Sequence, residues 1–281
     1  MKFLPAARYR GRVHPIERLR AVARSSAIDA VDLVRETATA LGAFRDDPAG
    51  MVAACRRMLV RHPTCGPLWW LTSRVCCAPE PTAEGWRCAE AVDADPTARH
   101  LARALPDDAT VLVVGATDTV GRALRARGDL RVLVLDGDDG AAASLVRRLD
   151  RAEVDAALVD PLGLGAAAAD VTVVLLDAAV AGPDRFVAPA GARAAAATAR
   201  HAGVAVWLVG GVGRFVPGRV FDVVASRLDA SGDEPWEAEE EVVPLDLVDD
   251  VVGPDGRTPV AAAVAATDCP IATELFREGL V

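Results

Sequence analysis

Five short apolar runs in the second half of the chain most strongly limit the fold. They are residues 111–114, 130–135, 154–159, 171–176 and 204–209. Turn-forming residues bound each run, and the segments between the runs are rich in Ala and Arg, a composition typical of helices. Strands that are apolar on both faces are typical of a parallel sheet covered by crossover helices. The fold class predicted is therefore α/β, with a Rossmann-like, doubly wound parallel sheet.

The first hundred residues show a helical pattern instead. Apolar side chains recur at intervals of three and four residues, at Ile28, Val31, Val34, Ala38 and Leu41. Prolines such as Pro48 and Pro63 divide this region, so we expect four or five short helices between residues 16 and 105. Polar residues around position 107 mark a boundary. The prediction is a helical N-terminal domain over residues 1–105 and a Rossmann-like C-terminal domain over residues 106–281.

The charge balance argues against a direct nucleic-acid partner. The chain has 31 basic and 40 acidic residues, a net charge of −9, and only one tyrosine. A negative surface repels phosphate backbones, and few aromatic side chains are present for base stacking. The only lysine is Lys2, which excludes a phosphate-binding or Schiff-base lysine from the body of the protein.

Other features argue against a membrane segment, a metal site and a cofactor. No apolar run reaches the ~18 residues needed to span a bilayer, and the N-terminus lacks the apolar core of a secretory signal. The expected location is cytoplasmic. Six cysteines form no CxxC pair and have no histidine at ligand spacing, so they are interpreted as reduced, mostly buried thiols.

Residues 175–217 carry the strongest resemblance to a known family. A strand ends on Asp177, a GPD turn leads to Gly191, an Ala-rich helix follows, and an apolar strand ends in Gly-Gly. This order resembles the α/β/δ-subunit family of translation initiation factor 2B and its relatives, methylthioribose-1-phosphate isomerase and ribose-1,5-bisphosphate isomerase. Residues 63–71 (PTCGPLWWL) and 244–247 (PLDL) are similar to further segments of that family.

The resemblance implies where catalytic residues would lie. In the isomerases a cysteine after the first Rossmann strand and an aspartate after a later one form the acid/base pair. Gly115 stands at the cysteine position, and Asp177 matches the aspartate if the following loop is one residue longer; an ungapped match falls on Ala178. The family's Asn-Lys is Ala188-Pro189 here, and the Arg-Pro after the second strand is replaced by the acidic residues 136–139. Asp177 is thus the one catalytic candidate.

Candidate ligand-binding residues come from both halves of the chain. Arg24, Ser25 and Ser26 resemble the Arg-Gly loop that binds substrate in the N-terminal domain of the isomerases. They join Gly115, Thr117 and Asp177 as the predicted site. The competing interpretation of Ser25 and Ser26 is structural, because serine commonly caps a helix, here one beginning near residue 27.

A second pattern, VVGATDTVGRAL, resembles the dinucleotide-binding loop of atypical short-chain dehydrogenases, with Asp136 placed to bind a ribose. Asp118 stands in place of the middle glycine, where its charge would oppose a pyrophosphate. Those enzymes also have a Tyr/Lys pair in the active site, whereas the only tyrosine and the only lysine of this chain are Tyr9 and Lys2. The alternative explanation is that Gly115 and Gly121 permit close packing of strand and helix.

The predicted function is therefore a non-catalytic protein resembling initiation factor 2B. It would bind a small anionic metabolite, such as a sugar phosphate or nucleotide, or a protein partner, and act as a homodimer. We expect the dimer contact at the helix over residues 191–203 and at the segment after Val209. The alternatives are a sugar-phosphate aldose-ketose isomerase with altered acid/base residues and an NAD(P)-binding protein resembling an oxidoreductase.

Overall fold

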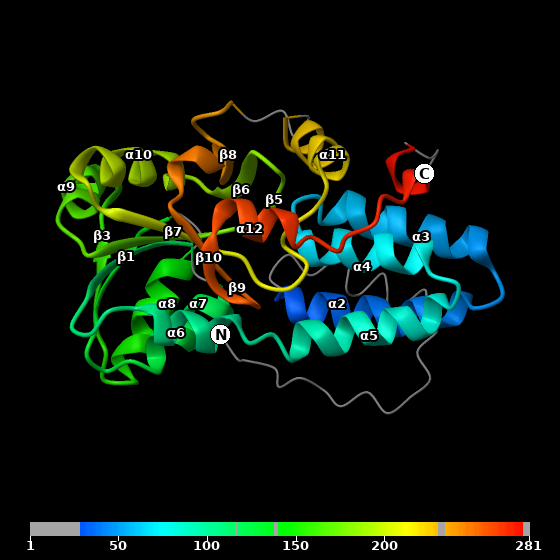
Figure 1. Cartoon of the computed structure of the whole chain (residues 1–281), viewed down its shortest axis with the longest axis horizontal. Helices are drawn as coiled ribbons and strands as arrows, with labels where there is room; N and C mark the ends of the chain where they lie inside the picture. The colour runs from blue at the N-terminus through cyan, green and yellow to red at the C-terminus, as the bar shows by residue number, and fades with distance from the viewer. Residues whose placement is uncertain (1–28, 116, 138–139, 230–233, 278–281) are drawn as a thin grey trace, which may run out of the picture.

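The computed structural model describes residues 29–115, 117–137, 140–229 and 234–277. Helices form the first part of this chain, and all but the last of them lie together at one end of the molecule (Figure 1). They are α2 (Ala30–Leu41), α3 (Pro48–Arg61), α4 (Gly66–Cys77), α5 (Pro81–Asp93) and α6 (Thr97–Ala104). Five helices over residues 29–105, the described part of this region, agree with the prediction of a helical N-terminal part.

Local sequence signals explain where these helices begin. Asp29 accepts a hydrogen bond from the main-chain N–H of Val31 and caps α2, and Asp47 caps α3 in the same way through Gly50. Prolines occupy the first turn of α3, α4 and α5, where a missing N–H costs nothing. The helix expected to begin near residue 27 begins at Ala30, so Asp29 rather than a serine is its cap. A carboxylate accepts the same orphan N–H and also complements the helix dipole.

A seven-stranded sheet forms the other part of the molecule. Its strands are β1 (Thr110–Val114), β2 (Arg131–Leu135), β3 (Asp155–Val159), β4 (Val173–Asp177), β7 (Ala205–Val209), β9 (Asp250–Gly253) and β10 (Gly256–Pro259). Their order is β10-β9-β7-β4-β1-β2-β3, and all neighbours are parallel except β9 and β10. All five predicted strands are confirmed. The order reverses between β1 and β4, which is the place where doubly wound sheets bind ligands.

Helices cover both faces of the sheet (Figure 1). On one face, α6, α7 (Asp118–Arg125) and α8 (Ala141–Asp150) pack against alternate strand residues such as Val111 and Val113. On the other, α9 (Leu164–Ala169) and α10 (Ala192–Ala202) pack against Leu112 and Val114. This is why both side-chain sets of β1 are apolar.

Gly121 fits the expectation of close packing. A Cβ at this position would lie 3.2 Å from Leu145 Cδ1 of α8. A side chain on that face of α7 would therefore have to push the two helices apart.

The sequence analysis missed a second, smaller sheet. It is antiparallel and consists of β5 (Val180–Ala181), β6 (Arg185–Pro189) and β8 (Glu240–Pro244). The stretch after the GPD turn and residues 240–244, for which no element was predicted, are therefore strands. The β9–β10 hairpin, α11 (Gly218–Asp229) and α12 (Val260–Ala265) also lie in the part of the chain for which no elements were predicted.

One buried core joins early and late parts of the chain. Phe221 of α11 and Leu275 near the C-terminus belong to the same cluster as Met58 and Trp69 of the helical region. Conversely, Leu101 of α6 packs with the strands of the large sheet. Contacts therefore cross position 105 in both directions, and the boundary placed there stays a prediction.

Candidate functional site at the ends of β1 and β4

Asp177 is the last residue of β4, beside β1 at the reversal point of the sheet. Its carboxylate accepts a hydrogen bond from the main-chain N–H of Thr117 at 3.2 Å, and the residue is only 5% exposed. Burial raises the pKa of Asp177, against smaller opposing effects of the Arg214 charge and of hydrogen bonding to Thr117. The side chain therefore holds a proton at higher pH than an ordinary aspartate does.

Gly115 follows β1 and directly faces Asp177. Its φ is +103°, a conformation that favours glycine, and a Cβ there would lie 2.7 Å from Asp177 Cβ and 3.4 Å from Pro189 Cγ. The structure thus brings together three positions that the resemblance matched to the isomerases' cysteine, aspartate and lysine. The backbone at Gly115 leaves no room for a cysteine side chain.

Arg214 is a member of this site that the sequence analysis missed. It lies in the loop after β7, and its Nη1 donates to the main-chain oxygens of Ala178 at 2.8 Å and Ala179 at 3.1 Å. Its charge also lowers the pKa of Asp177, Cys65 and Glu240, three groups whose pKa burial raises overall. One signal could have found it: Arg214 follows the Gly-Gly at the end of a strand that neighbours β4.

The space beside Asp177 is narrow. The cavity measures about 20 Å³, close to the room that one water molecule needs. Its charged lining consists of Asp29, Asp95, Asp177, Arg122 and Arg214. Among the described residues, three carboxylates and two guanidinium groups therefore line a space that is too small for a sugar phosphate.

The other predicted residues divide into two groups. Thr117 lies in the same cavity as Asp177, whereas Arg24, Ser25 and Ser26 fall outside the described residues. Asp118 begins α7, is exposed, and pairs with Arg122 at 3.2 Å.

Two searches of the described part of the chain gave negative results. The described residues contain no group of three or more His, Cys, Asp or Glu side chains that could hold a metal ion. No helix among them combines the length and the apolar character needed to cross a bilayer.

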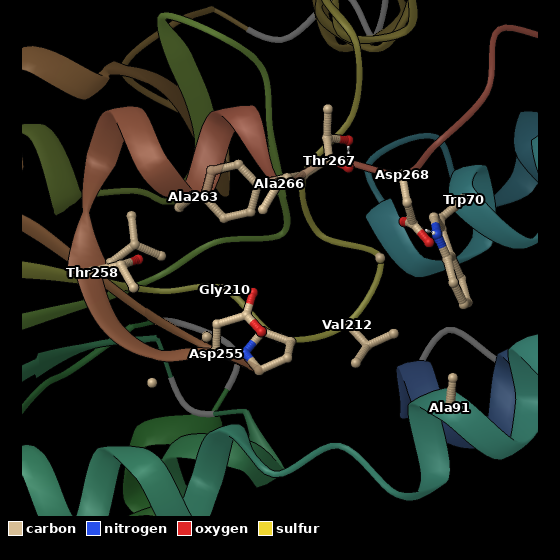
Figure 2. A pocket seen from close by; sticks show the side chains of 17 residues that line it. Trp70, Ala91, Gly210, Val212, Asp255, Thr258, Ala263, Ala266, Thr267 and Asp268 are labelled. Carbon is tan, nitrogen blue, oxygen red and sulfur yellow. Dashed lines mark hydrogen bonds between the residues drawn. The ribbon is translucent and has the colours of Figure 1, made fainter.

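A larger cavity lies on the other side of the loop that follows β7 (Figure 2). It measures about 270 Å³ and is bounded by the Gly210–Gly213 segment, the β9–β10 turn, α12 and Trp70. Asp255 and Asp268 supply its charged groups. The sequence analysis did not identify this cavity, although glycines at positions 210, 211, 213, 253 and 256 mark the two turns that build it.

Solved structures with the same fold cover most of the chain. The translation initiation factor eIF-2B of Pyrococcus horikoshii OT3 matches with a TM-score of 0.73 at 13% identity, over 89% of this chain and 98% of that one. The fold is that of an initiation factor 2B subunit. The eIF2B beta subunit of Chaetomium thermophilum matches with a TM-score of 0.71 at 16% identity, over 92% of each chain.

A third structure with the initiation factor 2B fold is an assembly. A chain of the tetrameric complex of eIF2B beta and delta subunits from C. thermophilum matches with a TM-score of 0.68 at 18% identity, over 89% of this chain and 92% of that chain. No protein-family model and no curated protein matches the sequence. At these identities the likeness confirms the expected fold, and function has to be argued from the site.

Proposed function

We propose that this protein is a non-catalytic protein with the initiation factor 2B fold that works by assembling with a second copy of itself. The observation that carries the first part is the contact between Gly115 and Asp177. An aldose-ketose isomerisation needs a proton donor and acceptor about 3 Å from the atoms they serve. Asp177 supplies one group, and the backbone at Gly115, with its positive φ, supplies no second one.

The narrow cavity supports the same proposal. A space of about 20 Å³ with three carboxylates in its described lining is poorly suited to a phosphorylated sugar or a nucleotide. Of the two partner classes expected from the sequence, we therefore favour a protein partner over a small anionic metabolite. The fold also occurs in a tetrameric complex of eIF2B subunits, so its surface is compatible with assembly.

Helix α10 offers the most suitable face for such assembly. Ala192, Ala195, Ala196 and Ala199 are buried against the molecule's own sheet. Ala194 and Ala197 are exposed on the other side, where small side chains allow another backbone to approach closely. The segment after Val209, by contrast, is used internally, because Val212 N–H donates to Asp95 at 2.8 Å. We therefore place the contact on α10 alone.

Two measurements test the proposal. We expect turnover of methylthioribose 1-phosphate and of ribose 1,5-bisphosphate to stay below about 1 s⁻¹, the low end for ordinary enzymes. We expect light scattering to give the mass of a dimer, and the double variant Ala194→Glu, Ala197→Glu to give a monomer. The control is Ala261→Glu, Ala262→Glu on the exposed face of α12. A monomeric wild type, or a dimer that survives the α10 substitutions, refutes the assembly.

One observation favours a second candidate, an isomerase whose acid/base group has moved. Cys65 precedes α4, and Gly66 N–H donates to Ala179 O at 3.1 Å, two residues beyond Asp177. The charge of Arg214 acts on both the Cys65 thiol and the Asp177 carboxyl. If turnover is found, this candidate requires that Cys65→Ser and Asp177→Asn each remove about 10²-fold or more of it.

The NAD(P)-binding alternative has a direct test of its own. The Asp118 carboxylate is at the start of α7, where a pyrophosphate would have to lie. We expect calorimetry to detect no sub-millimolar binding of NAD or NADP. A micromolar dissociation constant would establish the alternative in place of the proposal.

A further inference from the structure

The 270 Å³ cavity is separate from the Asp177 site and does not depend on the function proposed for it. It lies where β7 and β9 end, and these are parallel neighbours in the sheet. Gly211 and Val212 line both cavities, so the loop after β7 forms the wall between them. The carboxyl ends of parallel strands are common ligand positions in this fold class.

Glycines shape the cavity walls. A Cβ at Gly210 would lie 2.8 Å from Phe215 Cε2, and one at Gly253 would lie 2.9 Å from Gly210 O. Gly213 has a φ of +76° and packs against Trp70. No side chain fits at these three positions without displacing a neighbour. The loop after β7 and the β9–β10 turn therefore pack closely around the cavity. The cavity is slightly smaller than those that hold drug-sized ligands, so a suitable occupant is small.

The charge of the lining indicates what the cavity can hold. Its titratable side chains are the carboxylates of Asp255 and Asp268, and the lining among the described residues contains no Arg, Lys or His. Asp268 accepts from Trp70 Nε1 at 2.7 Å and pairs with Arg74. Asp255 is exposed and forms no ion pair with any described residue. A cation gains from this lining, whereas a phosphate or carboxylate is repelled.

The apolar part of the lining indicates the body of the ligand. Val212, Phe215, Ala263 and Trp70 line the cavity together with the two carboxylates. Figure 2 shows Trp70 next to Asp268 and Val212 on the loop after β7. A bare metal ion would leave these side chains unused, whereas a cation with a short hydrocarbon body would cover them. Asp255, Ala266 and Asp268 are exposed, so the cavity opens to solvent.

We propose that this cavity binds a small organic ammonium ion, held by Asp255 against the apolar side chains of the wall, because the Asp268 carboxylate is already engaged by Trp70 and Arg74. The test uses choline and butylammonium, each paired with a neutral molecule of the same shape, 3,3-dimethylbutan-1-ol and 1-butanol respectively. Ligand-observed NMR and calorimetry measure binding to the full chain. We expect dissociation constants of about 1 mM for at least one cation and at least about tenfold weaker binding of its neutral partner.

Three variants locate the binding. Asp255→Asn removes an exposed charge and should weaken cation binding by about fivefold, with a smaller loss at high salt. Ala266→Phe fills the cavity from an exposed position and should abolish binding. The control, Asp246→Asn, neutralises an exposed aspartate outside the cavity and should leave binding unchanged. Circular dichroism confirms that each variant is folded.

Each other outcome overturns the proposal. Equal binding of cation and neutral partner would mean that the cavity selects apolar shape and not charge. Binding that survives Ala266→Phe would place the cation elsewhere on the acidic surface. Competition by ribose 5-phosphate would show a preference for anions, and no binding of either cation at about 50 mM would show that the cavity is not a cation site.

Discussion

Two buried carboxylates, one in each part of the molecule, differ in how they are satisfied. Glu84 on α5 is 6% exposed and accepts hydrogen bonds from Arg74 Nε at 2.5 Å and Arg87 Nε at 2.8 Å. Asp177 at the end of β4 is 5% exposed and accepts one from a main-chain N–H. Burial alone would raise the pKa of both groups, but the two arginines reverse the effect for Glu84.

This difference in compensation suggests a structural role for Glu84 and a functional role for Asp177. The ion pair of Glu84 with Arg74 joins α5 to α4, and the pair with Arg87 lies within α5, so the charge of Glu84 supports the helical packing. The charge of Asp177 is compensated only in part, by the Arg214 charge and by the hydrogen bond from Thr117, so an ionised carboxyl there lowers the stability of the fold. Strongly perturbed groups with little structural use are typical of functional sites. Asp177 fits that description, although glycine stands at position 115, where the isomerases have the cysteine that works with the aspartate.

The largest expected effect comes from restoring that partner. Gly115→Cys places a Cβ against Asp177 in a backbone of positive φ, which costs about 1–2 kcal/mol for the conformation and about as much again for the overlap. We expect the free energy of unfolding to fall by about 3 kcal/mol in urea denaturation. The control is Gly128→Cys, because a Cβ at Gly128 meets nothing within 4 Å. Equal stability of the two variants would mean that the site can accept the isomerase cysteine after all.

The next effect tests the paired carboxylate. Glu84→Gln removes the charge that Arg74 and Arg87 share, and we expect a loss of about 2 kcal/mol at pH 7. The pKa of Glu84 is lowered, so its stabilisation is present above the ordinary pKa of a glutamate and is lost as the pH falls through the lowered value. The deficit should therefore shrink toward acid pH. Glu90→Gln, at an exposed position on the same helix, is the control and should change stability little at any pH.

Asp177→Asn should act in the opposite direction. The pKa of Asp177 is raised, so the folded state favours the protonated form, and the ionised carboxyl costs stability as the pH rises above its ordinary pKa. The amide keeps an acceptor for Thr117 N–H without the charge. We expect a gain of about 1 kcal/mol at pH 7 that disappears near pH 4. A loss of stability at pH 7 would show that the carboxylate is structurally paired, and the comparison with Glu84 would fail.

How far the sequence predicts this molecule depends on whether a feature is local. The five predicted strands were found because each is a largely apolar run, visible without knowledge of its partners. Four of them have buried residues, and the fifth, β3, lies at the edge of the sheet and has none. The second sheet was missed because β5 has only two residues and because Phe186 pairs with Val243, far along the chain. Such strands carry no periodic pattern of sufficient length.

The candidate site shows the same limit. Gly115, Thr117 and Asp177 were predicted from the resemblance of their segments to known families, and the structure brings them together. Arg214 was missed because its one local signal, a position shortly after the Gly-Gly that follows β7, does not show which groups its side chain contacts. Its role depends on the main-chain oxygens of Ala178 and Ala179, which only the folded chain brings within reach. The 270 Å³ cavity could not be predicted for the same reason, since its lining residues, among them Trp70, Gly210 and Asp255, come from distant parts of the chain.

The smallest expected effect is a difference in thiol reactivity between the adjacent residues Cys76 and Cys77, which extends the comparison from carboxylates to thiols. Cys76 hydrogen-bonds with Cys55 of α3, which lowers the pKa of Cys76, whereas burial raises the pKa of the neighbouring Cys77. For Cys76 the effect of a hydrogen-bonding partner on the pKa outweighs that of burial, whereas for Cys77 burial is the largest effect. We expect alkylation by iodoacetamide, resolved by tandem mass spectrometry, to begin at lower pH for Cys76 than for Cys77, because the thiolate is the reacting form.

The substitution Cys55→Ala tests the cause of that difference. It removes the hydrogen bond from Cys76 while leaving Cys77 in place, so the pH at which Cys76 reacts should rise toward that of Cys77. Cys88→Ala removes another buried thiol, one that lies beside Glu84, and should leave the difference unchanged. If both cysteines react at the same pH in the wild type, or if Cys55→Ala has no effect, pairing does not set the pKa of thiols in the helical region. The contrast would then hold for the carboxylates Glu84 and Asp177 alone.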